Sequence, residues 1–335
     1  MTRWRALWPA GLALAIASCG GQTPAPRPPA AAPEATLHAG PLTDYVPAAG
    51  LRWMVVVRPD ALLGSRELRT ALELVIPSEQ RRAFAQSSGV ALESTTHAVV
   101  AGFDFATVYF ARTPAGATVE ERFSERLVTT PKVASPHSRL RRVTGVIGQT
   151  PQTLLLLDDE WIAVSVGSAL PARAAEAFAL GRLKKSPPAL RGAALAELPP
   201  AMLEEPVAFY APGPFDTSWA KGARGLLESA TALGVTARPV SPEQLDVTVY
   251  LAGEWPEPDA ASRLREAWED LAQDSLGRLL ALDEPSEAPR TSGTSTLLVL
   301  RTRLAARPLA QGLKAAVSAE VSEILELGHP AKNRK

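Results

Sequence analysis

The sequence contains a single cysteine, Cys19, and a lone thiol has a narrow choice of chemistry. It cannot close a disulfide within the chain, and it has no second thiolate with which to share a metal ion. Cys19 follows the small residues Ala17 and Ser18, at the end of an apolar run. We therefore do not interpret this thiol as a redox or nucleophilic group.

The N-terminal residues have the order of a secretory signal. Arg3 and Arg5 form a basic start, and residues 6–17 form an apolar stretch. About a dozen apolar residues suit the core of a signal peptide, whereas a membrane-spanning helix needs about 20. We predict a signal peptide over residues 1–18. Two alternatives are an ordinary secretory signal cut near Ala17, which leaves the cysteine unmodified, and a cytoplasmic protein with an apolar N-terminus.

The run Ile16-Ala17-Ser18-Cys19 resembles the lipobox of bacterial lipoproteins, in which the cysteine becomes the lipidated first residue of the mature protein. The resemblance implies a diacylglyceryl thioether and an N-acyl chain on Cys19. Two or more acyl chains hold a protein stably on a membrane, whereas one holds it only marginally. Gly20 stands where an aspartate would signal retention in the inner membrane. The resemblance therefore implies an anchor in the outer membrane of the cell envelope.

Residues 19–38 have the composition of a tether, rich in proline and alanine. Such a stretch has little to bury and favours extended polyproline structure, at about 3.1 Å per residue. At that rise, residues 20–38 would hold the folded part up to roughly 60 Å from the bilayer. We expect this lipidated segment to act as a spacer.

A second candidate for chemistry is Ser218-Trp219-Ala220-Lys221, which matches the Ser-x-x-Lys pattern of penicillin-recognising enzymes. In those enzymes a lysine one helical turn beyond the serine helps to activate it. The partner motifs Lys-Thr-Gly and Ser-Asp-Asn are missing from this sequence, as is a Gly-x-Ser-x-Gly elbow. We therefore favour a helix start with an exposed lysine over a serine hydrolase that uses Ser218 and Lys221.

The residues that commonly bind metals are scattered. His38, His97, His137 and His329 lack the i, i+4 spacing of a zinc-binding helix. The acidic run 158–160 lacks the spaced ligands and the glycine of a calcium loop, so we interpret it as a hairpin turn. Glycine patterns that cradle phosphates are absent as well. We expect no metal, no cofactor and no catalytic residue.

The charge balance excludes general nucleic-acid binding. The chain has 35 basic and 35 acidic side chains, and removal of the leader with its two arginines leaves a net charge of −2. Binding to nucleic acid depends on an excess of basic residues that neutralise phosphates. The expected partner is the membrane, through Cys19, with other envelope proteins as further candidates. A hydrophobic fraction of 46% predicts a substantial core beyond the tether.

Two further features are candidates for a binding surface. Arg139 and Arg141 alternate on an expected strand, where they would form a basic stripe toward an envelope anion. The simpler alternative is the solvated face of a strand. Trp255 lies between Glu254 and Pro256 in an expected turn, and it is a candidate binding aromatic.

The expected strands come in adjacent pairs and the expected helices stand singly between them. Alternation predicts a hairpin between 154–158 and 161–167, and pairing of 99–103 with 106–111. Apolar residues at helical spacing predict a capped helix from Thr118 and a long helix over 259–279. Together these predict an α+β fold, a mostly antiparallel sheet with helices packed on one face. The ferredoxin-like arrangement is the nearest named motif.

The pattern occurs twice along the chain. Residues 104–111 and 246–252 share Thr-Val-Tyr at an offset of about 140 residues. The blocks 55–59 and 153–157 find counterparts in the same order, at 207–212 and 295–300. We predict two similar α+β copies. The predicted boundaries are 1–18 signal peptide, 19–38 tether, 39–183 first copy, 184–205 linker or helix, 206–328 second copy and 329–335 disordered tail.

These observations favour a non-enzymatic binding or scaffolding module held at an envelope surface. The alternative is a carrier that holds a lipid or another apolar ligand in a cleft between the two copies. The body of the chain is similar only to uncharacterised lipoproteins of high-GC Gram-negative bacteria, of the myxobacterial kind. That resemblance implies no activity.

Overall fold

Alternation of buried and exposed residues builds the strands of this protein. In β3 (Ala106–Arg112) the side chains of Val108 and Phe110 are buried while Tyr109 is exposed, as a period of two requires. The protein is described by a computed structural model. The described residues are 36–114, 116–158, 160–183, 187–215, 224–241, 243–255, 259–285, 288–292 and 297–315.

Twelve strands in the described ranges form one sheet, in the spatial order β11-β12-β10-β9-β8-β1-β2-β3-β7-β6-β5-β4. Neighbouring strands are antiparallel throughout. The prediction of a mixed fold around a large antiparallel sheet is confirmed. Besides β3, the strands are β1 (Leu51–Val57), β2 (His97–Phe103), β4 (Lys132–His137), β5 (Leu140–Ile147), β6 (Thr150–Leu157), β7 (Trp161–Gly167), β8 (Val207–Pro212), β9 (Ala230–Ser241), β10 (Gln244–Gly253), β11 (Arg290–Ser292) and β12 (Leu297–Ala305).

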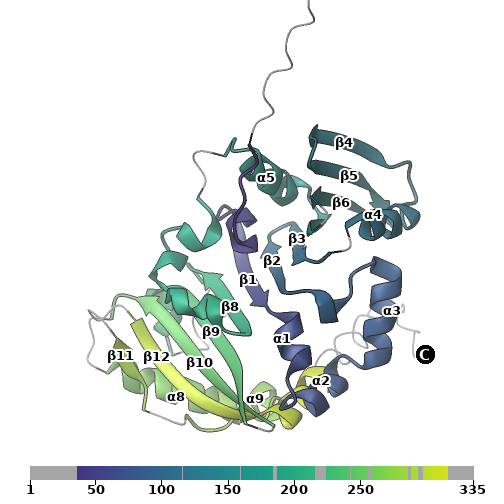
Figure 1. The fold of residues 1–335 in the computed structure, drawn as a ribbon. Coiled ribbons are helices and arrows are strands. Elements are labelled where there is room, and N and C mark those ends of the chain that lie inside the picture. The colour runs from purple at the N-terminus through teal and green to yellow at the C-terminus, as the bar shows by residue number, and fades with distance from the viewer. Residues whose placement is uncertain are drawn as a thin grey trace, which may run out of the picture. The chain divides into compact units, whose positions relative to one another are not determined.

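Strands β1 and β8 join the two halves of the sheet. Met54 of β1 lies opposite Tyr210 of β8, and Val57 lies opposite Val207. The backbone ladder is therefore continuous from β11 to β4 (Figure 1). The stretches that the sequence predicted as two similar copies thus contribute strands to a single sheet.

Helices connect the strands and cover the sheet (Figure 1). Residues 306–315 are also helical. The α-helices are α1 (Pro59–Gly64), α2 (Arg69–Val75), α3 (Ser78–Ser88), α4 (Gly116–Glu125), α5 (Leu170–Ala179), α7 (Leu226–Ser229), α8 (Ala260–Gln273) and α9 (Ser275–Leu279). Single 3-10 turns are η1 (Leu42–Tyr45), η2 (Leu92–Ser94), η3 (Ala189–Arg191), η4 (Leu195–Glu197) and η5 (Pro200–Glu204).

The helices lie on both faces of the sheet, which corrects the expected arrangement on one face. The largest group of buried apolar side chains, which we name the central cluster, includes Leu155 and Leu157 of β6 and Ala172 of α5. Leu154 and Leu156 of β6 instead pack in another cluster, with Phe123 of α4. Successive residues of a strand point to opposite faces, so α5 and α4 lie on opposite sides. The physical reason is that all four leucines are apolar, and both faces of β6 therefore need cover.

The strand order also differs from the ferredoxin-like motif. Strands β1, β2 and β3 lie side by side in chain order, and so do β8, β9 and β10. A split β-α-β unit would instead insert another strand between consecutive ones. The turn Asp104-Phe105 joins β2 directly to β3, and the long helical connection of residues 58–96 also returns the chain to the position beside β1, so no strand is inserted between them.

Two predicted helices have different ends in the structure. Helix α4 begins at Gly116, so Thr118 lies within its first turn and does not cap it. The long helix predicted over 259–279 is two helices, since α8 ends at Gln273 and α9 begins at Ser275.

Where it is described, the predicted linker 184–205 belongs to the core. Ala189, Leu198 and Met202 are buried in the central cluster, against the sheet. A Cβ atom at Gly234 of β9 would lie only 2.6 Å from Cε of Met202, so the absence of a side chain lets this segment approach the sheet. The segment is therefore a structural layer and not a spacer between domains.

The shared Thr-Val-Tyr motif does not mark equivalent positions. Val108 packs in the central cluster, whereas Val249 packs with Leu251 in a separate cluster beneath α8. The residues that alternate with Val249, namely Tyr250 and Ala252, are the ones that pack in the central cluster. Val108 and Val249 thus point to opposite faces of one sheet. A shift of one residue in register reverses every side chain in this way.

Candidate functional site

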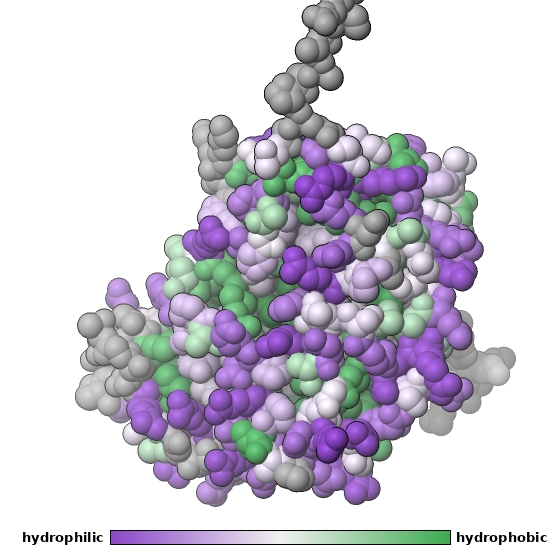
Figure 2. Space-filling view, viewed as in Figure 1, coloured by the Kyte–Doolittle hydropathy of each residue, from purple (hydrophilic) through white to green (hydrophobic). Residues whose placement is uncertain are grey.

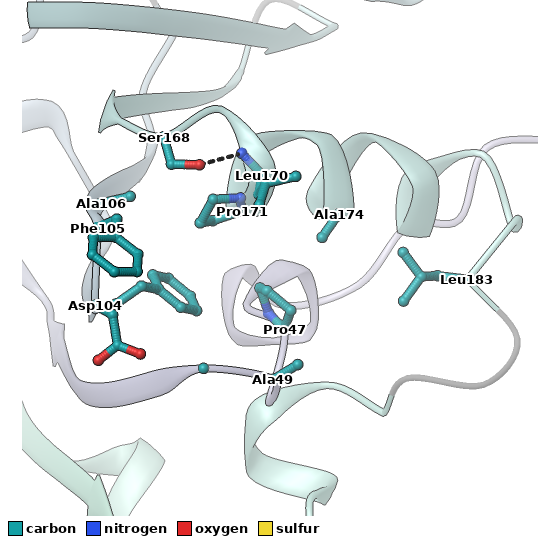
Figure 3. Close-up of a pocket in the computed structure, with 12 residues that line it drawn as sticks. Pro47, Ala49, Asp104, Phe105, Ala106, Ser168, Leu170, Pro171, Ala174 and Leu183 are labelled. Atoms are coloured by element: carbon teal, nitrogen blue, oxygen red, sulfur yellow. Dashed lines mark hydrogen bonds between the residues drawn. The ribbon is translucent and has the colours of Figure 1, made fainter.

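An apolar pocket of about 510 Å³, which we name the hairpin pocket, lies between the β2–β3 turn and the start of α5 (Figure 3). Its walls come from the segment before β1, from the turn after β2, and from α5 with its flanking residues. Figure 2 shows that hydrophobic residues on the viewed face occur in small patches between hydrophilic ones. The lining residues of the pocket are Pro47, Ala49, Gly50, Phe103, Asp104, Phe105, Ala106, Ser168, Leu170, Pro171, Ala174 and Leu183.

Phe105 forms one wall because a tight turn leaves it at the tip of a hairpin. Phe103 and Ala106 pair at the ends of β2 and β3, so Asp104 and Phe105 are the two residues of the turn. The side chain of Phe105 is 85% exposed. An ion pair of 2.5 Å from Arg52 Nε to Asp104 Oδ1 holds the turn. A large apolar ring is therefore presented to solvent at a fixed point.

Leu170 forms the opposite wall, at the first residue of α5. Its side chain is 73% exposed. Its backbone N–H donates to Ser168 Oγ at 3.3 Å, and Pro171 at the start of the helix restricts the backbone there. Figure 3 shows Phe105 on one side of the pocket and both Leu170 and Pro171 on the other. The two exposed apolar side chains thus flank the same opening.

A backbone hydrogen bond ties these two walls together. The N–H of Ser168 donates to the carbonyl oxygen of Phe105 at 3.0 Å. Just before it, Gly167 has a φ of +91°, and a Cβ atom there would lie 2.6 Å from the same oxygen. Glycine is needed at this position because it tolerates positive φ and leaves room for the turn. The separation of Phe105 and Leu170 is therefore set by the backbone.

Aromatic packing fixes the segment that supplies Pro47. The ring centroid of Tyr45 lies 4.6 Å from that of Trp161 and 5.4 Å from that of Phe178. The Tyr45 hydroxyl donates to the carbonyl of His38 at 2.8 Å, and burial raises the pKa of this hydroxyl. These contacts hold the wall that carries Pro47 against the sheet.

The hairpin pocket offers burial of apolar groups and little chemistry. Asp104 is the one ionisable residue in its described lining, and Arg52 pairs with it. Ser168 carries the one hydroxyl there, and its oxygen already accepts the N–H of Leu170. A serine needs an adjacent base to become a nucleophile, and neither histidine nor lysine is among the described lining residues. The arrangement is suited to binding.

The residues predicted to carry chemistry lie outside the described part of the chain. Cys19 and most of the tether precede residue 36, and Ser218 and Lys221 fall within residues 216–223. Lipidation at Cys19 and hydrolysis at Ser218 therefore stay predictions.

Trp255 is not a surface aromatic, which corrects its prediction as a binding residue. It is buried in the cluster beneath α8, together with Leu264 and Leu298. The apolar face of α8 needs a large partner on the sheet side, and the indole ring supplies it.

The predicted basic stripe is neutralised by carboxylates. Arg139 lies in the turn before β5 and donates two hydrogen bonds of 2.6 Å to Asp158. Arg141 pairs with Glu120 of α4 at 2.9 Å. The two arginines therefore serve different ion pairs and do not form a free cationic surface.

The described residues contain no group of three or more histidine, cysteine, aspartate or glutamate side chains that could hold a metal ion. Over the same ranges, no helix combines the length and the apolar character that a membrane span requires.

Sequence reasoning missed Phe105 and Leu170, although each had a local signal. Phe105 is an aromatic residue beside Asp104 in a short turn, and Leu170 is an apolar residue directly before Pro171 at a helix start. What the sequence does not reveal is that the two meet, because the pairing of β3 with β7 brings them together.

Comparison of the chain with protein-family models, with curated proteins and with solved structures found no match.

Proposed function

We propose that the protein is a lipoprotein of the outer membrane, anchored through Cys19, whose folded part is a non-enzymatic binding module. Its partner is an envelope protein that inserts an apolar side chain into the hairpin pocket. The observation that carries this proposal is the pair of exposed apolar side chains, Phe105 and Leu170, held across one apolar pocket. Exposed apolar side chains gathered at one pocket favour an interaction site over a purely structural role.

Burial of these two side chains would provide substantial binding energy. Removing a phenylalanine or leucine side chain from water contributes about 1.5–3 kcal/mol. Each 1.4 kcal/mol changes a dissociation constant about tenfold. Because a backbone hydrogen bond already holds the segments of Phe105 and Leu170 together, little backbone conformational entropy is lost when a partner binds. The pair therefore has the character of an interface anchor.

The geometry favours a protein partner over a carried lipid. A small-molecule site buries about 70–90% of its ligand, whereas Phe105 at the rim of the hairpin pocket is largely open to solvent. The alternative function, that of a lipid carrier, would require a cleft for the ligand between the two copies. At that boundary, β1 and β8 are joined by a backbone ladder from Met54 to Val57.

A serine hydrolase at Ser218 and Lys221 is the least favoured function. A serine-reactive fluorophosphonate probe tests it directly. We expect no labelling of the full chain. Labelling that disappears in Ser218→Ala would contradict the non-enzymatic proposal.

We further infer that the two halves of the sheet are related copies. Outward from the junction, the strands run β1-β2-β3-β7-β6 in one half and β8-β9-β10-β12-β11 in the other. Helix α4 follows β3 and α8 follows β10, and each packs on the face turned away from the central cluster. Strands β4 and β5 are then an addition to the first half. On this basis β12 corresponds to β7, and not to β6 as the block match 153–157 with 295–300 suggested.

The partner proposal is tested by crosslinking in intact cells followed by purification of the full-length lipoprotein. Phe105→Ser removes one anchor, and Phe84→Ser is its matched control. Phe84 is a phenylalanine on α3 that is 45% exposed and does not line the pocket. We expect the wild type and Phe84→Ser to retain the same partner protein and Phe105→Ser to lose it. Equal recovery from all three chains would contradict the proposal, as would recovery from none.

A further inference from the structure

Basic residues stand side by side at the ends of strands β1, β2 and β3, and we name them the arginine row: Arg58, His97 and Arg112. His97 pairs with Arg112 between β2 and β3. Val57, the last residue of β1, pairs with Ala98, so Arg58 comes next to His97 on its other side. Adjacent strands lie about 4.8 Å apart, so the backbones of the two arginines are about 10 Å apart, with the histidine between them.

The arginine row lies on the face of the sheet that carries the central cluster. Val56, Val99 and Phe110 are each two residues from a member of the row, and all three are buried in that cluster. Residues two apart in a strand point to the same face. At this end of the strands the face therefore changes from core residues to basic side chains, and His97 and Arg112 are exposed.

Neither arginine of the row pairs with a carboxylate within the described ranges. Their side chains also make no hydrogen bond there, and the interactions of Arg58 are those of its backbone, whose N–H donates to the carbonyl of Pro206. Asp60 is the carboxylate whose charge acts on His97. Its Oδ1 accepts the backbone N–H of Ala61 at 2.8 Å and does not pair with either guanidinium. Two cationic forks are thus left open to a ligand.

Buried N–H donors of the same row also lack acceptors. The Nε of Arg58 is buried without a hydrogen-bond partner among the described residues. Trp161 of β7 extends the row, because it pairs with Arg112, and its buried Nε1 has no partner in these residues either. A buried donor that is left unpaired is costly. The unmet groups of the row are all donors, which makes the row complementary to a ligand rich in acceptors.

The charges of both arginines act on the imidazole between them. Partial burial lowers the pKa of His97, and the positive charges of Arg58 and Arg112 lower it further, whereas Asp60 raises it. The ring is therefore mostly neutral at pH 7. Its Nδ1 lies 3.2 Å from the hydroxyl oxygen of Thr96. When that hydroxyl donates to Nδ1, the ring proton lies on Nε2, which is then a further donor.

We propose that the arginine row binds a phosphate monoester between Arg58 and Arg112. A guanidinium fork donates paired hydrogen bonds to phosphate or carboxylate oxygens. A carboxylate satisfies one fork, whereas a phosphate monoester has enough oxygens to accept from both forks and from Nε2 of His97. Its negative charge also offsets the repulsion between the two guanidinium groups.

The arginine row stands apart from the hairpin pocket. His97 begins β2, and Phe103, which lines the pocket, ends it. The row contributes no residue to the lining of the pocket. Phosphate binding at the row is therefore independent of the proposed protein partner.

Isothermal titration of the full-length protein in detergent with inorganic phosphate tests this site. We expect saturable binding that Arg58→Gln and Arg112→Gln each weaken at least about tenfold, because each removes hydrogen bonds to a charged group. Arg265→Gln is the matched control and should bind as the wild type does. It changes the net charge equally, but Arg265 pairs with Glu269 on α8, outside the row. Urea denaturation of each variant checks that it is folded.

The imidazole of His97 gives a second, local readout. A phosphate beside the ring favours its protonated form. Saturating phosphate should therefore raise the pKa of His97, measured by NMR titration of the ring and assigned with His97→Gln. Arg112→Gln should reduce this rise, and Arg265→Gln should not.

Two esters distinguish the source of the phosphate. Binding of dihexanoyl phosphatidate tighter than that of glucose 6-phosphate would assign the row to a lipid headgroup, and any other order would assign it to soluble phosphate esters. In either case Arg112→Gln must weaken binding. The proposal is overturned if the wild type shows no saturable binding of phosphate, if either arginine variant binds as the wild type does, or if phosphate leaves the pKa of His97 unchanged.

Discussion

The N–H of Ser168 donates a hydrogen bond of 3.0 Å to the carbonyl oxygen of Phe105 and joins the end of β7 to the β2–β3 turn. The pairing of Ala106 with Gly167 places the two segments in register for this bond. The spacing of Phe105 and Leu170 across the hairpin pocket therefore depends on this backbone contact. The position of Phe105 should be sensitive to changes at Gly167 and insensitive to changes at the surface.

Gly167→Ala is predicted to lower the free energy of unfolding by about 1–3 kcal/mol. An alanine there has an unfavourable positive φ, and its Cβ atom collides with the carbonyl oxygen of Phe105. Chemical denaturation measures the change. The control is Gly64→Ala at the end of α1, where an added Cβ atom meets no neighbour. Equal stability of the two variants would show that the close approach does not constrain the pocket.

Phe105→Ser and Leu170→Ser are each predicted to leave the free energy of unfolding within about 0.5 kcal/mol of the wild type. Both side chains are exposed, so the folded protein gains little from them. Phe110→Ala on the same hairpin is the contrast: its ring is buried, and its loss should cost about 3–5 kcal/mol. Thermal and urea denaturation measure all three. A large loss of stability at Phe105 would mean that the ring is structural.

Local features of the fold were predictable because they depend on neighbouring residues. The hairpins β2–β3 and β6–β7 follow from alternation and short turns, and the structure confirms both. The junction of β1 with β8 was not predictable, since Met54 and Tyr210 are brought together by the whole sheet. The hairpin pocket was missed for the same reason. Each of its two walls has a local sequence signal, but the pairing of β3 with β7 that brings the walls together does not.

The face of the sheet to which each strand residue points was also not predictable from the sequence. The repeated Thr-Val-Tyr was a sound reason to expect related strands, yet Val108 and Val249 face opposite sides. Composition alone does not tell which face of a strand will be covered when both are apolar. Burial of Trp255 was likewise invisible, because the residues around it form an expected turn.

Tyr210→Phe is predicted to raise the free energy of unfolding by about 1 kcal/mol at neutral pH. The Tyr210 hydroxyl is buried and finds no hydrogen-bond partner within the described residues. Phenylalanine keeps the ring and removes the unsatisfied group. Urea denaturation of the two proteins measures the difference, and a less stable variant would mean that the hydroxyl is satisfied by a group such as bound water.

The same substitution carries a pH dependence. Burial raises the pKa of Tyr210 above its ordinary value of 10.0, so the folded state retains this proton at a pH where the unfolded chain has lost it. The Tyr210 hydroxyl therefore adds no pH dependence to the free energy of unfolding below about pH 10, and it lowers that free energy as the pH rises further. The wild type should therefore lose more stability than Tyr210→Phe between about pH 9 and 11. Parallel curves would contradict the desolvation of this hydroxyl.

Cys19→Ala is predicted to release the protein from the membrane fraction. The substitution removes the thiol that would carry the diacylglyceryl group, and no described helix could take over as a membrane span. Ser18→Ala is the control, because it keeps a small residue before the cysteine and should leave the protein in the membrane fraction. Fractionation followed by immunoblotting gives the answer. Unchanged distribution of Cys19→Ala would count against lipidation.

The most direct measurement of the central claim is site-specific photo-crosslinking in intact cells. A photoreactive phenylalanine analogue replaces Phe105 in the full-length lipoprotein, and in a parallel strain it replaces Phe84. A partner seated in the hairpin pocket predicts one discrete protein adduct at position 105 and none at position 84. Addition of Leu170→Asp should abolish that adduct, because a carboxylate on the opposite wall disfavours apolar contact. No adduct at position 105, or one that persists with Leu170→Asp, would contradict the account.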